Sequence, residues 1–206
     1  MKLYHHPMSS NARRARMTAI LLDLPVELEL VDIATGAGQN PAYLALNPNG
    51  KVPTLVDGDM VLWESHAIMT YMADKKPGNK LYPADLAARA RVNQWLFWVS
   101  SHFSASTAML VNQNFLKQMM GKGPADPNIV ALAETEFARC CKVLDAHFAK
   151  NKYLCGDAMS LADVSLSAPL MYIGPGKLPV EGYANLHAWF TRMQDTDAWK
   201  QTQPQM

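Results

Sequence analysis

The feature that most constrains the fold is a change in hydrophobic periodicity near residue 80. Before this point, short stretches typical of strands alternate with stretches typical of helices. From Asp85 onwards, apolar residues recur at intervals of three and four, which indicates helices alone. Such a chain is expected to form an α/β part followed by an all-α part.

The first part contains the elements of a small mixed sheet. Residues 26–31 alternate strictly between apolar and acidic, which predicts a half-buried strand. Asp57-Gly58-Asp59 separates two apolar runs and predicts a hairpin. With a strand at 2–5 and helices at 11–22 and 65–74, the order becomes strand-helix-strand and then strand-strand-helix. This is the order of a thioredoxin-like domain with helices covering the sheet.

The domain boundaries follow from the turn-rich stretch between the two patterns. We expect a thioredoxin-like domain at 1–76, a linker at 77–86 and a helical domain at 87–206. Helices are expected at 86–120, 129–149 and 160–171. The last begins with Ser160 and Asp163, spaced as in a capping box with Asp in place of the usual Glu.

Charge and cysteine content limit the possible partners and location. A formal net charge of +1 and the lack of a basic run predict binding to neither nucleic acid nor an anionic membrane. The start of the chain lacks the apolar run of a signal peptide, and no stretch is apolar enough for a membrane span. Three cysteines without a CxxC motif suggest reduced thiols in the cytoplasm. His5 and His6 are adjacent in a strand and point to opposite faces, so no metal site is expected.

Two separated motifs resemble the cytosolic glutathione transferases. They are Asn-Pro-Asn-Gly-Lys-Val-Pro-Thr-Leu-Val-Asp at 47–57 and Trp-Glu-Ser-His-Ala-Ile at 63–68. The likeness covers nearly the whole chain and is greatest to serine-type, bacterial-like members related to the phi, theta and zeta classes. It implies glutathione as co-substrate, a small electrophile as second substrate, a helical domain that lines the second-substrate site, and a homodimer.

The resemblance assigns glutathione-binding roles around the first motif. It implies that Pro53 is cis and that the backbone of Val52 pairs with the cysteinyl part of glutathione, as an added strand would. Lys51 and Gln39 match positions that hold the glycyl end, although Gln39 stands where some relatives carry a basic residue. The structural alternative for Pro53 is a trans proline at the entry to a strand. The structural alternative for Gln39 is a solvated loop residue without a ligand.

The second motif places Glu64 and Ser65 at the start of a helix. Both residue types suit a helix start for structural reasons alone. The resemblance adds that the helix N–H groups and the Ser65 hydroxyl receive the γ-glutamyl carboxylate, and that Glu64 binds the ligand's ammonium group.

The chemistry requires a donor for the glutathione sulfur. An ordinary thiol has a pKa of about 8.5, so little thiolate exists at neutral pH without stabilisation. Ser9, just after the first strand, resembles the activating serine of serine-type classes. Ser10 is the second choice and Asn11 a further amide donor, whereas capping of the helix is the structural alternative. Tyrosine is the activating residue type in other classes of the family, but Tyr4 lies within the first strand, too early in the sequence for this role.

These residues predict a glutathione transferase that conjugates the thiolate to electrophilic, mostly apolar compounds. One alternative is a non-catalytic glutathione-binding or scaffold protein of the same fold. Another is a glutathione-dependent isomerase, but isomerases of maleylacetoacetate carry a cysteine after the serine pair, where this chain has Asn11. The sequence does not identify the electrophile.

Overall fold

The structure is a computed structural model, and it describes residues 1–204. Two compact units are distinguished within it. One comprises Met1–Tyr82 together with the described residues from Thr196 onwards, and the other comprises Pro83–Asp195. No helix in the described part of the chain is long and apolar enough to cross a membrane.

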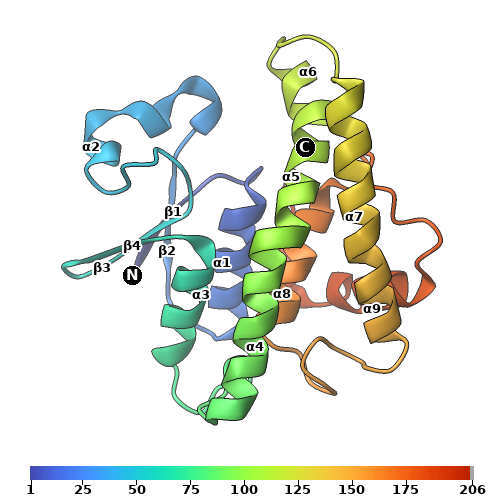
Figure 1. The fold of residues 1–206 in the computed structure, drawn as a ribbon. Helices are drawn as coiled ribbons and strands as arrows, with labels where there is room; N and C mark the ends of the chain where they lie inside the picture. Colours follow the sequence, from blue (N-terminus) through green and yellow to red (C-terminus); the bar gives the residue numbers. More distant parts are fainter. Residues whose placement is uncertain (205–206) are drawn as a thin grey trace. The chain divides into compact units, whose positions relative to one another are not determined.

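The first unit is built on a four-stranded mixed sheet (Figure 1). The strands β1 (Lys2–His5), β2 (Glu27–Leu30), β3 (Thr54–Asp57) and β4 (Met60–Trp63) are ordered β2-β1-β3-β4. β1 pairs in parallel with β2 and antiparallel with β3, and β3 and β4 form the expected hairpin. The mixed sheet of a thioredoxin-like domain is thereby confirmed.

Helices α1 (Ser10–Leu21) and α3 (Ser65–Asp74) pack against each other beside the sheet, and the short α2 (Pro41–Leu44) follows two 3-10 turns. The core of this unit combines Leu3 and Leu55 from the sheet with Ile68 and Met72 from α3, all at most 1% exposed. Apolar side chains on one face of each element explain why these segments assemble.

The prediction of a half-buried β2 is wrong. Leu28 and Leu30 are 46% and 61% exposed, although alternation along the strand would bury one face. The physical reason is that β2, an edge strand paired only with β1, has no helix of the described chain packed closely on its face. Alternation indicates which residues share a face, whereas the amount of cover depends on the neighbouring elements.

The second unit is helical throughout. α4 (Leu86–Trp98), α5 (Ser104–Val111) and α6 (Lys117–Met119) follow one another through π-helical turns at Val99–Phe103 and Asn112–Leu116. α7 (Pro127–Phe148) packs on α5, and α8 (Leu161–Ser167), a 3-10 turn at Ala168–Tyr172 and α9 (Ala184–Gln194) complete the unit. The expected capping box at Ser160 and Asp163 is present.

The last helix, α10 (Asp197–Gln201), belongs to the first unit, whereas the sequence placed it in a helical domain at 87–206. It is held on α1 by Arg13, whose guanidinium carbon lies 3.6 Å from the centre of the Trp199 ring. Arg13 also donates hydrogen bonds to Thr202 Oγ1 and to the carbonyl of Trp199, at 3.1 and 2.9 Å. The expected domain boundaries, with a linker at 77–86 between domains at 1–76 and 87–206, stay a prediction.

Candidate functional site

The motif residues meet in a small pocket at one end of the sheet. It has a volume of about 90 Å³ and combines residues from the start of α1, the loop before β3 and the start of α3. Six of the nine predicted site residues line it, namely Asn11, Lys51, Val52, Pro53, Glu64 and Ser65. Ser9, Ser10 and Gln39 are not among its lining residues.

The loop before β3 presents backbone groups at this pocket. The Val52-Pro53 peptide bond is cis, as the resemblance implied. Val52 lies outside both strand ladders, and its backbone N–H and C=O make no hydrogen bond within residues 1–204. A peptide that lies along this segment therefore meets a free donor and a free acceptor, as at an open sheet edge.

Buried polar side chains hold this loop in place. Asn47, which is 2% exposed, donates to the Lys51 carbonyl at 2.8 Å and accepts from the N–H of Asn49 at 3.0 Å. Tyr43 donates to the same carbonyl at 2.7 Å. These bonds fix the backbone of Lys51 and so restrict the position of Val52.

Three lining residues were missed by the sequence reasoning, namely Asn47, Asn49 and Trp63. The first two belong to the Asn-Pro-Asn-Gly turn, and asparagine in turns commonly bonds to the backbone two residues on. That signal could have identified Asn47 as the residue that organises the loop. Trp63 is the last residue of β4. It lines the pocket because β4 ends beside the start of α3, and no local sequence pattern indicates this position.

The start of α3 is suited to an anion. Glu64 occupies the position before the helix, but its side chain makes no capping hydrogen bond. Ser65 is the first helical residue rather than the cap and is 5% exposed. The first N–H groups of α3 are therefore left without a side-chain cap in the described structure, and such groups bind carboxylates well.

The backbone of Glu64 is unusual, with φ at 75° and ψ at 115°. A residue other than glycine in this region costs about 1–3 kcal/mol, and such strain concentrates at functional sites. Here the conformation turns the chain sharply between β4 and α3. It brings the Glu64 side chain to the pocket beside the helix start.

The start of α1 contributes polar groups of two kinds. Ser9 caps the helix, because its Oγ accepts from the N–H of Ala12 at 3.2 Å, and its hydroxyl hydrogen remains available to donate. Asn11 Oδ1 accepts from Arg14 Nη1 at 2.6 Å. With its oxygen directed at Arg14, Asn11 has its amide N–H₂ left to donate towards the pocket that it lines. Ser10 is the first residue of the helix.

One fixed cation, Arg14, lies next to Asn11 at the start of α1. Burial lowers the pKa of Arg14 to about 10, which still leaves the guanidinium charged at neutral pH. Burial, and to a lesser degree the charge of Arg14, lowers the pKa of His66 to about 3, so His66 is neutral. One fixed cation and two helix N-termini therefore favour an anion at this place.

Gln39 lies close to the loop without lining the pocket. A Cβ atom added at Gly50 would come within 2.5 Å of Gln39 Nε2, so the amide lies over the residue before Lys51. No group of three or more His, Cys, Asp or Glu side chains that could hold a metal occurs among residues 1–204. The donors at the pocket are amides, a hydroxyl and a lysine, which suit carboxylates rather than a cation.

Comparison with known proteins gives a consistent result. The family model described as "Glutathione S-transferase, N-terminal domain" matches residues 1–74, and that described as "Glutathione S-transferase, C-terminal domain" matches 114–196. Glutathione S-transferase 3 of Zea mays is 41% identical over 167 residues, which cover 80% of this chain and 74% of that protein. Glutathione S-transferase F10 of Arabidopsis thaliana is 33% identical over 95% of this chain and 93% of its own length.

A similar structure shows the same architecture. The crystal structure of glutathione transferase F2 from Populus trichocarpa superimposes with a TM-score of 0.90 at 26% sequence identity, over 98% of this chain and 96% of that one.

Proposed function

The chain belongs to the glutathione S-transferase family, and from this premise we propose how its own residues bind glutathione and activate the thiol. As a member of the family it is a glutathione transferase, an enzyme that uses glutathione as co-substrate. The single observation that supports our assignment best is the pocket shared by Asn11, Val52 and the uncapped start of α3.

Glutathione binding would use both ends of this pocket. The Val52 N–H and C=O pair with the cysteinyl residue of the tripeptide, because they have no other partner within residues 1–204. The N–H groups at the start of α3 and the Ser65 hydroxyl receive the γ-glutamyl carboxylate, and Glu64 binds the ammonium group. Lys51, assisted by Gln39, binds the glycyl carboxylate.

Activation of the thiol would depend on the start of α1. The Ser9 hydroxyl donates to the sulfur, and it can do so while its oxygen continues to cap the helix. The Asn11 amide is a second donor, oriented by Arg14, and Ser10 is the alternative serine. Together with the positive end of α1, these donors stabilise the thiolate relative to the thiol. The thiolate then attacks an electrophilic carbon, and the leaving group departs with its electron pair.

Ultraviolet titration of the bound thiol tests this proposal. Loss of one donor at a developing anion typically costs about 10²- to 10³-fold in rate. We therefore expect Ser9→Ala to raise the pKa of bound glutathione and to lower kcat, while KM for glutathione changes little. Asn11→Ala should raise the pKa by a smaller amount, and Ser10→Ala is the matched control.

An equal effect of Ser9→Ala and Ser10→Ala would contradict the choice of Ser9. An ordinary thiol pKa in the wild type would instead support a non-catalytic binding protein. A direct assay with maleylacetoacetate tests the isomerase alternative.

We further propose that the protein is a homodimer located in the cytoplasm. Family members form two-fold dimers, and sedimentation equilibrium would detect one here. Cys140, Cys141 and Cys155 are all free, which agrees with a reducing compartment. Burial raises the pKa of Cys141 to about 12, so that thiol is unreactive.

A further inference from the structure

A closed ring of buried hydrogen bonds lies at the loop before β3. Tyr43 Oη donates to the Lys51 carbonyl at 2.7 Å and lies 2.9 Å from Thr54 Oγ1. Asn47 Nδ2 donates to Thr54 Oγ1 at 3.1 Å and to the same carbonyl at 2.8 Å. The three side chains come from α2, the turn after it and β3, and each is at most 6% exposed. Water therefore does not replace these bonds, and the ring joins three separate segments.

The number of available hydrogens fixes the direction of each bond in this ring. Tyr43 has one hydroxyl hydrogen, which the bond to the Lys51 carbonyl uses, so Thr54 is the donor in the contact between the two hydroxyls. Thr54 Oγ1 in turn accepts from Asn47, whose two amide hydrogens both belong to the ring. Burial raises the pKa of Tyr43, so the phenol keeps its hydrogen at neutral pH. Loss of the Thr54 hydroxyl therefore leaves a buried amide hydrogen without an acceptor.

The ring determines the direction of the Val52 N–H. The Lys51–Val52 peptide bond is trans, and in a planar trans peptide the carbonyl and the N–H point in opposite directions. Two donors hold the Lys51 carbonyl on the buried side, so the Val52 N–H points away from the ring. Val52 lines the glutathione pocket, and its N–H makes no hydrogen bond within residues 1–204. The ring thus presents a backbone donor of fixed direction to a ligand in the pocket.

We propose that Thr54 is a positioning residue for glutathione binding. It does not line the pocket, and it acts through Tyr43 and Asn47 on the peptide group that carries the Val52 N–H. The inference rests on the proposed function, because it requires glutathione to pair with the backbone of Val52. A donor that is oriented before the ligand arrives loses little freedom on binding, so the ring contributes to affinity rather than to the chemistry at the sulfur.

Calorimetry with glutathione on Thr54→Val and Thr54→Ser tests the proposal. Valine keeps the shape of threonine and removes the hydroxyl, whereas serine keeps the hydroxyl and removes a methyl group. In free Thr54→Val, Asn47 and the Lys51 carbonyl can rearrange to satisfy the unpaired hydrogen, and glutathione must reverse that rearrangement. We therefore expect Thr54→Val to weaken glutathione binding about tenfold and Thr54→Ser to stay within about twofold of the wild type.

Steady-state kinetics separate positioning from a role in the chemistry. KM for glutathione should rise in Thr54→Val, while kcat at saturating glutathione stays within about twofold of the wild type. The pKa of the bound thiol should be unchanged, because the substitution leaves Ser9 and Asn11 in place. Tyr43→Phe removes one of the two donors to the Lys51 carbonyl and should likewise raise KM without lowering kcat.

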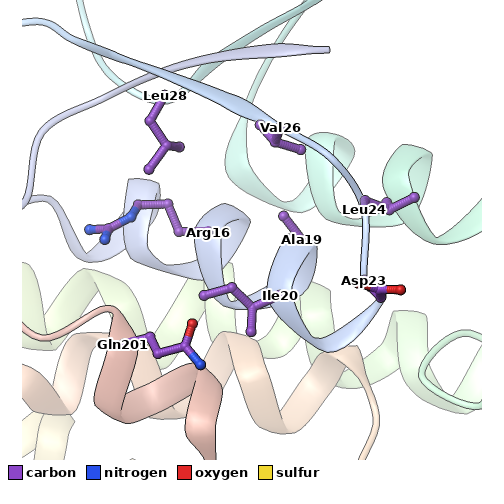
Figure 2. Close-up of a pocket in the computed structure, with 8 residues that line it drawn as sticks. All are labelled: Arg16, Ala19, Ile20, Asp23, Leu24, Val26, Leu28 and Gln201. Atoms are coloured by element: carbon purple, nitrogen blue, oxygen red, sulfur yellow. The ribbon is translucent and has the colours of Figure 1, made fainter.

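Two control variants distinguish lost positioning from lost stability. Thr107→Val removes another buried hydroxyl, which donates to the Phe103 carbonyl at 2.7 Å in the second unit. Leu24→Ala removes apolar contacts within the first unit, at a groove between α1 and β2 that shares no lining residue with the glutathione pocket (Figure 2). Leu24→Ala should lower the urea midpoint, and both controls should leave the affinity for glutathione unchanged.

Unchanged affinity in folded Thr54→Val would overturn the proposal. So would a loss in Thr54→Ser or Leu24→Ala as large as that in Thr54→Val, because affinity would then follow stability rather than the hydroxyl. If Thr54→Val does not fold, Tyr43→Phe takes its place, and an unchanged KM in that variant would overturn the proposal. Failure of the wild type to bind glutathione would contradict the proposed function itself, and this inference with it.

Discussion

Replacement of Asp163 by asparagine tests how much of the stability depends on one buried carboxylate. Asp163 is fully buried and accepts four hydrogen bonds. Its Oδ1 accepts from the N–H of Leu154 at 2.9 Å and from Trp189 Nε1 at 3.0 Å. Its Oδ2 accepts from the N–H and the hydroxyl of Ser160, at 2.9 and 3.0 Å. One side chain thereby connects the start of α8, the preceding loop and α9.

The expected loss follows from this geometry. Asparagine retains one oxygen for Leu154 and Trp189 but places an N–H₂ group against Ser160. The Ser160 hydroxyl can rotate and accept from the new amide, whereas the Ser160 N–H faces another donor and stays unsatisfied. A buried donor without a partner costs about 1–3 kcal/mol, and the remaining bonds lose their charge assistance. Burial raises the pKa of the Asp163 carboxyl, so removal of the buried charge offsets the second loss. We expect Asp163→Asn to lower the free energy of unfolding by about 2 kcal/mol, a large share of the usual 5–15 kcal/mol or so.

Urea unfolding followed by tryptophan fluorescence and circular dichroism measures this loss. With a slope of about 2–3 kcal/mol per molar urea, the midpoint should fall by about 1 M. Asp126→Asn is the matched control, because Asp126 caps α7 at the surface by accepting from the Asn128 N–H at 2.9 Å, and asparagine caps equally well. If Asp163→Asn lost less than about 1 kcal/mol, or no more than the control, the reasoning would be refuted.

Three further predictions concern the first unit. Gly50→Ala should weaken glutathione binding about tenfold, because φ is +61° and the new Cβ would lie 2.8 Å from the backbone carbonyl oxygen of Gly38, which cannot move aside as a side chain can; calorimetry measures the loss. Arg13→Gln should accelerate hydrogen exchange in α10 and cost about 2 kcal/mol in thermal unfolding, because it removes the contact with the Trp199 ring. His66→Gln should reduce the loss of stability on acidification. The pKa of His66 is about 3 in the folded protein and about 6.5 in the unfolded chain, so only the unfolded chain takes up this proton between those values. The free energy of unfolding of the wild type therefore falls by up to about 1.4 kcal/mol per pH unit over this range.

Each of these predictions has a control or an outcome that contradicts it. Gly58→Ala has nearly the same φ, +60°, but no atom within 4 Å of the new Cβ, so equal effects at both glycines would exclude the steric explanation. Unchanged exchange in α10 would show that Arg13 does not retain that helix. A His66→Gln variant as acid-sensitive as the wild type would show that another group is responsible for the loss.

Much of the fold was predictable because its signals are local. The hairpin around Gly58, the helix that begins at Ser65 and the Ser160–Asp163 capping box each depend on residues a few positions apart. The change from mixed to helical periodicity likewise separates segments without reference to their packing. The cis bond before Pro53 did not follow from such local reasoning and came from the family resemblance.

The glutathione pocket was predictable only in part. Lys51, Val52, Glu64 and Ser65 were identified through their motifs, and the pocket brings them together with Asn11. Asn47 and Trp63 were not identified, because their position at the pocket depends on how the loop and β4 are placed in space. Titration of bound glutathione in the Ser9→Ala and Asn11→Ala variants distinguishes the two proposed donors.

The sequence by itself determined which segments form helices and strands and which residues share a face, because periodicity and capping act within a few residues. Only the tertiary structure decided how much each face is covered. It left Leu28 exposed on an edge strand and Arg16 Nε without a partner in the described chain, and it joined Arg13 to Trp199 across 186 positions. Burial and pairing depend on contacts between distant segments, and no local pattern encodes them.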